Sequence, residues 1–311
     1  RVLEAAQSLG YTGNELARGL RQQTTRTIGL IISDILNPFH AHVASGLEQE
    51  AAQHGYSAIL CTSTEDVEKE RRSLELLRRH QVCGVVLEPT EGSRVEVEAL
   101  VKAGIPVVEV DRMSGAQGAA TVLSDNIGGA ASAARHLLSL GHHRIATVAG
   151  DPQLISGRER LEGLRMALAA SGIPLPDHRV VTGRYTSADG YQAALELLAR
   201  PGPRPTALFL ANIEMTLGTL RALKELGLRV PEDISVISFD DASWAPLVSP
   251  PLSVVTQDPV GLGRIAAQII INAVSHVPDT VPAVQRLPTT LVLRRSCGPP
   301  NDGSLRAVQT E

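Results

Sequence analysis

The sequence predicts an α/β fold with two doubly wound parallel-sheet lobes, preceded by two short helices and a polar linker. Apolar runs rich in β-branched residues alternate with segments of helical periodicity from residue 27 to residue 273, which is typical of βα units. Polar, turn-forming residues follow most of these runs. The ten or more predicted strands exceed one comfortable open sheet, which favours two similar lobes with a cleft between them.

The stretch from residue 26 to 46 shows the repeating unit most clearly. Thr27 to Ile32 is a short apolar run typical of a buried parallel strand. A polar loop follows at Ser33 to Asn37, and Pro38 suits the first position of a helix. The helix carries apolar residues at helical spacing: Val43, Leu47 and Ala51. This stripe either packs on its own sheet or contributes to a dimer interface.

The same reasoning applied to the rest of the chain predicts the remaining elements. The predicted strands are 28–32, 57–61, 84–87, 107–110, 121–123, 145–148, 179–182, 207–210, 234–238, 253–256 and 290–294. The predicted helices between them are 39–54, 67–79, 95–103, 128–140, 158–170, 188–199, 215–226 and 260–273.

Two further helices are predicted before the first strand. Val2 to Leu9 has one apolar face and ends at Gly10. A second short helix starts at the N-cap Asn14 and runs to Arg21. Both are too short to be stable alone in water. Because the sequence begins with Arg1 inside a helical pattern, we expect it to be a fragment or a trimmed chain.

Composition and motifs exclude several classes of protein. Three Cys without a CxxC spacing indicate a reducing compartment, with the cytoplasm as the default. No apolar run approaches the roughly 20 residues that a membrane span requires. His142 and His143 are adjacent and point apart, so we expect no metal site. No P-loop, GxSxG or HExxH occurs, which leaves an enzyme without a nucleophile and gives no reason to expect a cofactor.

Acidic residues follow several predicted strands, at Asp34, Asp111, Asp151 and the pair Asp240-Asp241. The carboxyl ends of strands in an open α/β sheet are where ligands bind, and carboxylates there can accept hydrogen bonds from hydroxyl groups. The alternative is that each of them caps a loop. Phe239 and Trp244 flank Asp240, which favours a ligand role at that position.

Two further polar residues have open alternatives. Asn212 follows a predicted strand and can donate and accept hydrogen bonds to a polyol, or can cap a helix. Arg160 lies near a predicted helix amino-terminus, where a cation is unfavourable unless a ligand uses it; otherwise it is a solvated charge.

The chain resembles the lactose repressor family of bacterial transcription regulators over nearly its whole length. The resemblance is carried by the segments LGYTGNELARGLR, RTIGLIISDILNPF, GIPVVEVDR, SDNIGGAASAARHLLSLGHHRIATVAGD, RERLEGLRMAL, PEDISVISFDD and SPPLSVVTQDPVGLGRIAA. It implies an amino-terminal helix-turn-helix whose start would precede Arg1, a hinge helix, and a two-lobed effector domain like type I periplasmic sugar-binding proteins. It also implies a homodimer, built partly on the helix 39–54, that binds operator DNA and a small-molecule effector.

The resemblance also assigns residues and boundaries. It implies effector contacts at Phe39, His40, Asp111, Arg160, Tyr185, Asn212 and Asp240, and DNA contacts of the hinge at Asn14, Ala17, Arg18, Leu20 and Arg21. It implies residues 1–25 as the DNA-binding remnant and hinge, 26–125 with 258–284 as one lobe, 126–257 with 285–297 as the other, and 298–311 as a tail. Gly13, Gly19, Ile213 and Ser238 depart from the family pattern.

The leading hypothesis is therefore an effector-responsive DNA-binding regulator. A solute-binding protein of a transport system would share the two lobes but should carry a signal peptide, which is not seen, and has no need of the hinge-like LARGLR segment. An α/β enzyme is the third alternative, and no residue set suggests its reaction.

Overall fold

The structure is a computed structural model that describes residues 25–277 and 283–301. The described residues divide into two compact units, which lie within Arg1–Val122 and Pro259–Gln285 (unit 1) and within Leu123–Asp258 and Arg286–Glu311 (unit 2). The chain therefore crosses between the units three times. The predicted helices at residues 2–9 and 14–21, and with them Asn14, Ala17, Arg18, Leu20 and Arg21, lie outside the described residues.

Unit 1 is built on a six-stranded sheet in the order β11-β5-β4-β3-β1-β2. The strands are β1 (Thr27–Ile32), β2 (Ser57–Thr62), β3 (Gly84–Leu87), β4 (Val107–Val110), β5 (Ala120–Ser124) and β11 (Val284–Leu287). Pairs β1–β2, β1–β3, β3–β4 and β4–β5 are all parallel. All four residues of β3 and of β4 are buried, as expected for strands covered on both faces.

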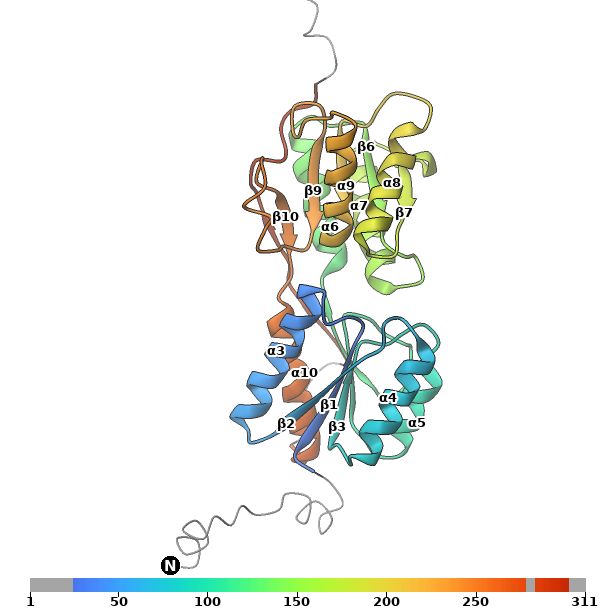
Figure 1. Ribbon diagram of the computed structural model, residues 1–311, viewed down its shortest axis with the longest axis vertical. Helices are drawn as coiled ribbons and strands as arrows, with labels where there is room; N and C mark the ends of the chain where they lie inside the picture. Colours follow the sequence, from blue (N-terminus) through green and yellow to red (C-terminus); the bar gives the residue numbers. More distant parts are fainter. Residues whose placement is uncertain (1–24, 278–282, 302–311) are drawn as a thin grey trace, which may run out of the picture. The chain divides into compact units, whose positions relative to one another are not determined.

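Helices cover both faces of this sheet (Figure 1). They are α3 (Pro38–Gln53), α4 (Val67–Arg79), α5 (Arg94–Lys102) and α10 (Pro259–Val274), with α3 and α10 packed on one face. The two backbones approach closely because both helices have glycine at the crossing: a Cβ at Gly46 would lie 2.0 Å from the Val260 carbonyl oxygen. Val43, Leu47 and Ala51 of α3 are at most 1% exposed within the single chain. These three side chains therefore pack inside unit 1 and do not form a dimer interface, while a homodimer built partly on this helix stays a prediction.

Unit 2 repeats the plan with a sheet in the order β12-β10-β9-β8-β6-β7. Its strands are β6 (Ile145–Ala149), β7 (Val180–Thr182), β8 (Ala207–Leu210), β9 (Ser235–Phe239), β10 (Ser253–Thr256) and β12 (Thr290–Val292). Neighbouring strands are parallel except for the pair β10–β12. The helices are α6 (Asn126–Ser139), α7 (Ile155–Ala170), α8 (Ser187–Ala199) and α9 (Ile213–Glu225). The predicted α/β class with two parallel sheets is confirmed.

The differences from the predicted elements have local causes. Helix α7 begins at Ile155, three residues before the predicted start. The sequence does not indicate this start, because no side chain caps the helix. Strand β11 is missing from the predicted set, since Val284 to Leu287 lies at a sheet edge with three residues that are not buried and forms no apolar run. The segment before β7 forms a short 3₁₀ turn at Asp177–Arg179.

Within residues 25–277 and 283–301, no helix is long and apolar enough to cross a membrane.

Candidate ligand-binding clusters

In unit 2, Arg160 is the centre of a buried polar cluster. Its side chain is held by a carbonyl and an amide: Nη1 donates to the Ala211 oxygen at 2.7 Å and Nε to Asn126 Oδ1 at 2.8 Å. The guanidinium carbon lies 3.9 Å from the centre of the Phe239 ring, so one face of the cation is stacked on an aromatic. Arg160 is only 3% exposed. The solvated-charge alternative is therefore wrong, and the earlier start of α7 moves Arg160 out of the first helical turn.

Asp240 lies beside Arg160, directly after β9. Its Oδ2 is 3.7 Å from Arg160 Nη1, and its Oδ1 accepts a hydrogen bond from the Gln257 amide. The Asp240 backbone is left-handed, with φ of 70°, which is uncommon for a residue other than glycine and recurs at functional sites. The structure thus joins two of the predicted site residues, Arg160 and Asp240, through a direct charge pair.

Asn212 and Tyr185 complete the predicted set in unit 2. Asn212 Oδ1 accepts from the Met215 N–H at 2.9 Å and caps α9, so the capping alternative is correct for this oxygen. Tyr185 has a left-handed backbone (φ 65°), and its hydroxyl lies 3.3 Å from Ser156 Oγ. A Cβ at Gly150 would be 2.1 Å from the Tyr185 hydroxyl, so the ring occupies space that the glycine leaves.

In unit 1, His40 is buried against a carboxylate. His40 Nε2 lies 3.2 Å from Glu88 Oε2, and Nδ1 lies 2.8 Å from the Asp34 carbonyl oxygen. Burial lowers the pKa of His40, but the charge and hydrogen bond of Glu88 outweigh it and raise the pKa to about 9. The pKa of Glu88 is lowered because, against its burial, His40 and Arg112 both stabilise the carboxylate. His40 is therefore a cation at neutral pH and already has an anionic partner.

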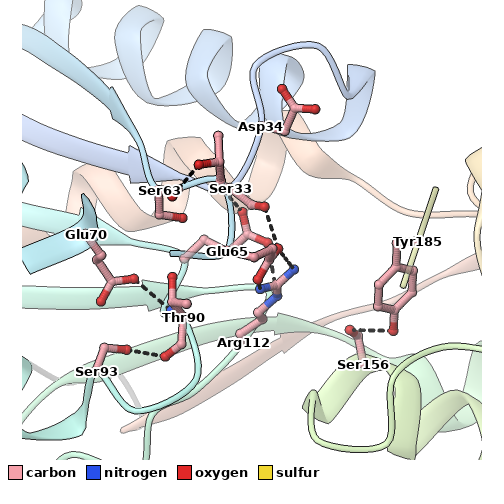
Figure 2. A network of polar contacts seen from close by, with 12 residues as sticks. Ser33, Asp34, Ser63, Glu65, Glu70, Thr90, Ser93, Arg112, Ser156 and Tyr185 are labelled. Carbon is pink, nitrogen blue, oxygen red and sulfur yellow. Dashed lines mark hydrogen bonds and ion pairs between the residues drawn. The ribbon is translucent and has the colours of Figure 1, made fainter. Parts of the chain in front are cut away.

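Arg112 continues this network from the loop after β4 (Figure 2). It donates to both carboxylate oxygens of Glu65, at 2.7 and 2.9 Å, and its Nε lies 3.1 Å from Glu88 Oε1. Ser33 links the two acids, because its N–H donates to Glu88 and its hydroxyl to Glu65. The pKa of Arg112 is raised, since these carboxylates outweigh its burial. Positive and negative groups thus alternate through this cluster.

Asp111 and Phe39 lie at the same cluster. Asp111 follows β4, is 7% exposed and has a left-handed backbone with φ of 61°. Its charge raises the pKa values of both His40 and Arg112. The Phe39 ring meets the His40 ring edge to face with centroids 5.5 Å apart, and Phe39 is half-buried.

Two of the other strand-end carboxylates, Asp34 and Asp151, cap loops. Asp34 accepts from the Leu36 N–H and Asp151 from the Gln153 N–H, both at 2.9 Å. Each hydrogen bond closes a local Asx-type turn. For Asp34 and Asp151 the capping alternative therefore accounts for the side chain.

Sequence reasoning missed several charged residues of both clusters. Glu88 follows β3 directly, as Asp111 and Asp240 follow their own strands, so the strand-end rule would have found it. Glu159 on α7 also belongs to the unit 2 cluster, because Asn126 Nδ2 donates to its Oε2 at 3.4 Å. Arg112 and Glu159 give no comparable signal, because a charged residue in a loop or on a helix is usually solvated. Among the described residues, no group of three His, Cys, Asp or Glu side chains could hold a metal ion.

Comparison with known proteins identifies the class. Residues 134–297 match the family of periplasmic binding protein-like domains. The ribose operon repressor of Escherichia coli is 34% identical over 278 residues, covering 89% of this chain and 84% of that protein. A LacI family regulator from Enterococcus faecium with bound ribose has a TM-score of 0.77 at 29% identity, covering 88% and 100% of the two chains. The lac repressor dimer bound to operator and the anti-inducer ONPF gives a TM-score of 0.84 at 27% identity, covering 96% and 89%.

The fold and these likenesses define an effector-responsive transcriptional repressor, and they favour this class over a transport protein or an enzyme. The chain belongs to the LacI family.

Proposed function

We propose that the effector of this repressor is a small neutral molecule rich in hydroxyl groups, such as a sugar. It contacts Arg160, Asp240, Asn212 and Tyr185 in unit 2 and Asp111, His40 and Phe39 in unit 1. Carboxylates accept hydrogen bonds from hydroxyl groups, guanidinium groups donate to them, and side-chain amides do both. Aromatic rings such as Phe39 can pack against the apolar face of a sugar ring.

The charge balance of the two clusters carries this proposal. In unit 2, Arg160 lies beside Asp240. In unit 1, His40 and Arg112 are paired with Glu88 and Glu65. An anionic effector such as a sugar phosphate would need a cation that is not already compensated, because burying unpaired charge is costly. The ribose bound to the Enterococcus faecium regulator supports a neutral sugar.

A thermal-shift panel tests the effector class. Neutral sugars, led by D-ribose, are compared with the corresponding phosphates, with ribose 5-phosphate as the matched anionic control. A ligand at 100 times its Kd stabilises the folded state by about 2.7 kcal/mol, which is readily detected. Stabilisation by a neutral sugar and none by its phosphate is the expected result. Stabilisation by phosphorylated compounds alone would contradict the proposal.

We further propose that the protein acts on operator DNA as a homodimer, through the hinge residues Asn14, Ala17, Arg18, Leu20 and Arg21. The likeness to the lac repressor dimer on its operator supports this. Paired hinge helices need two chains at one palindromic site. Sedimentation at micromolar concentration should give the mass of two chains, and a single-chain mass would contradict the dimer. Fluorescence anisotropy of the full-length protein with operator-length DNA measures DNA binding.

A further inference from the structure

Helix α7 approaches α6 unusually closely at Gly163. A Cβ at this position would lie 2.3 Å from the Ile127 carbonyl oxygen, so only glycine permits the contact. Glu159 lies one helical turn before Gly163 on the same face of α7. Asn126 is the residue before Ile127. The close approach therefore places Glu159 beside Asn126, and both are buried, at 7% and 0% exposed.

Glu159 binds an arginine from a distant part of the sequence. Arg286 Nη1 and Nη2 donate to the two Glu159 carboxylate oxygens at 2.8 and 2.6 Å, and Nη1 also lies 3.4 Å from the Ser124 carbonyl oxygen. A two-pronged arginine–carboxylate contact of this kind stabilises the pair and also fixes the orientation of both side chains. Arg286 is the first residue of unit 2 after the third crossing, and Ser124 is the second after the first crossing.

The charge of Glu159 sets the orientation of the Asn126 amide. Asn126 Nδ2 donates towards Glu159 Oε2 at 3.4 Å and the Ser124 oxygen at 3.3 Å, which leaves Oδ1 to accept from Arg160 Nε at 2.8 Å. The flipped amide would turn its oxygen towards a carboxylate and its NH₂ towards a guanidinium N–H. Both contacts would be repulsive, so the ion pair at Glu159 keeps an acceptor in front of Arg160.

We propose that Glu159, Asn126 and Arg286 are positioning residues for Arg160. They make its orientation depend on the segments that cross between the units. The second crossing has a member of the same network, since Gln257 donates to Asp240 one residue before the end of that segment of unit 2. Asn126, close to the first crossing, and Gln257, close to the second, thus contact the Arg160–Asp240 pair directly. Arg286, at the third crossing, reaches Arg160 through Glu159 and Asn126. The inference rests on the proposed function, in which Arg160 contacts the effector.

The first measurement needs no effector. Hydrogen exchange of arginine Nε–H groups is followed by NMR in the intact chain, with the Arg160 signal assigned by its loss in R160K. We expect E159Q and R286Q to speed Arg160 Nε–H exchange roughly 2- to 30-fold, the range typical of mutations in coupled networks. R229Q is the matched control, because Arg229 makes a similar two-pronged contact with Asp233 elsewhere in unit 2.

The second measurement is D-ribose affinity by calorimetry, which should fall by a similar factor in E159Q and R286Q and stay unchanged in R229Q. If E159Q fails to fold, R286Q still tests the positioning role, because the Arg286 side chain is 38% exposed and its replacement should leave the fold intact. An Arg160 signal that is unchanged in both variants, with a lowered melting temperature, would make the ion pair purely structural and overturn the proposal. Wild-type protein that does not bind D-ribose would count against the proposed sugar, while the exchange measurement judges the positioning role separately.

Discussion

His40 and Glu88 form a buried ion pair, with Nε2 and Oε2 3.2 Å apart and side chains 9% and 1% exposed. The two residues come from α3 and the loop after β3, so the pair joins two elements of unit 1. Because burial removes water from both side chains, each charge is compensated by its partner. Removing one charge should leave the other buried and uncompensated.

The pair predicts how the stability of unit 1 depends on pH. Since folding raises the pKa of His40 from 6.5 to about 9, its contribution is complete below pH 6.5 and is lost as the pH rises to about 9. Folding lowers the pKa of Glu88, so its contribution is complete above pH 4.5 and declines in acid. We expect urea unfolding to show a loss of up to about 3 kcal/mol between pH 6 and pH 9.5.

His40→Gln is the variant that checks this assignment. It removes the titrating group and should flatten the alkaline decline, whereas His54→Gln, on an exposed position of the same region, should keep it. An equal decline in wild type and His40→Gln would show that another group is responsible.

A second prediction concerns the Arg160–Asp240 pair in effector binding. Arg160→Lys loses the flat fork that reaches both Asn126 and Ala211, and Asp240→Asn removes the charge but keeps the shape. Each should weaken sugar binding by about 1.5 to 3 kcal/mol. Arg158→Lys, two residues earlier and exposed, should bind normally. Calorimetry with circular dichroism as the check on folding measures this, and unchanged affinity in both variants would remove the pair from the site.

A third prediction concerns His142, which is fully buried although His143 beside it is exposed. His142 Nε2 lies 2.8 Å from the Gly298 oxygen and Nδ1 2.9 Å from Thr206 Oγ1, so the ring joins the segment after β12 to the loop before β8 within unit 2. His142→Ala should cost about 1 to 3 kcal/mol of unfolding free energy, because it leaves buried polar groups unsatisfied. His143→Ala should change stability little. Equal melting temperatures for the two variants would contradict this role.

The sequence predicted the parallel sheets well because a strand buried on both faces must be apolar throughout, as in β3, β4 and β9. It failed where structure depends on distant partners. Strand β11 is a strand only because it pairs at the edge of a sheet. The amino-terminal turn of α7 has no capping side chain that would indicate it in the sequence.

The candidate site divides along the same line. Asp111 and Asp240 could be found because the rule about strand ends is local in sequence. The pairing of Arg160 could not be predicted, since the groups that it contacts, on Asn126, Ala211 and Asp240, come from three other segments of the chain. Nothing near Arg160 in the sequence distinguishes a buried, paired arginine from a solvated one.

The last prediction tests the helix contact on which the Arg160 cluster depends. In Gly163→Ala the new methyl group would meet the Ile127 carbonyl oxygen at 2.3 Å, and this neighbour is backbone that cannot rotate away. Alanine favours a helix by about 1 kcal/mol over glycine, so local propensity alone predicts stabilisation. Overpacking costs about 1 to 3 kcal/mol and should exceed that gain. Urea unfolding should therefore show a net loss. Glu162→Ala, exposed and one residue earlier, is the matched control and should change stability by less than about 0.5 kcal/mol. If α7 moves away from α6 to accommodate the methyl group, Arg160 Nε–H exchange should also accelerate. A Gly163→Ala protein more stable than wild type, with Arg160 unaffected, would show that the close approach does not hold the cluster together.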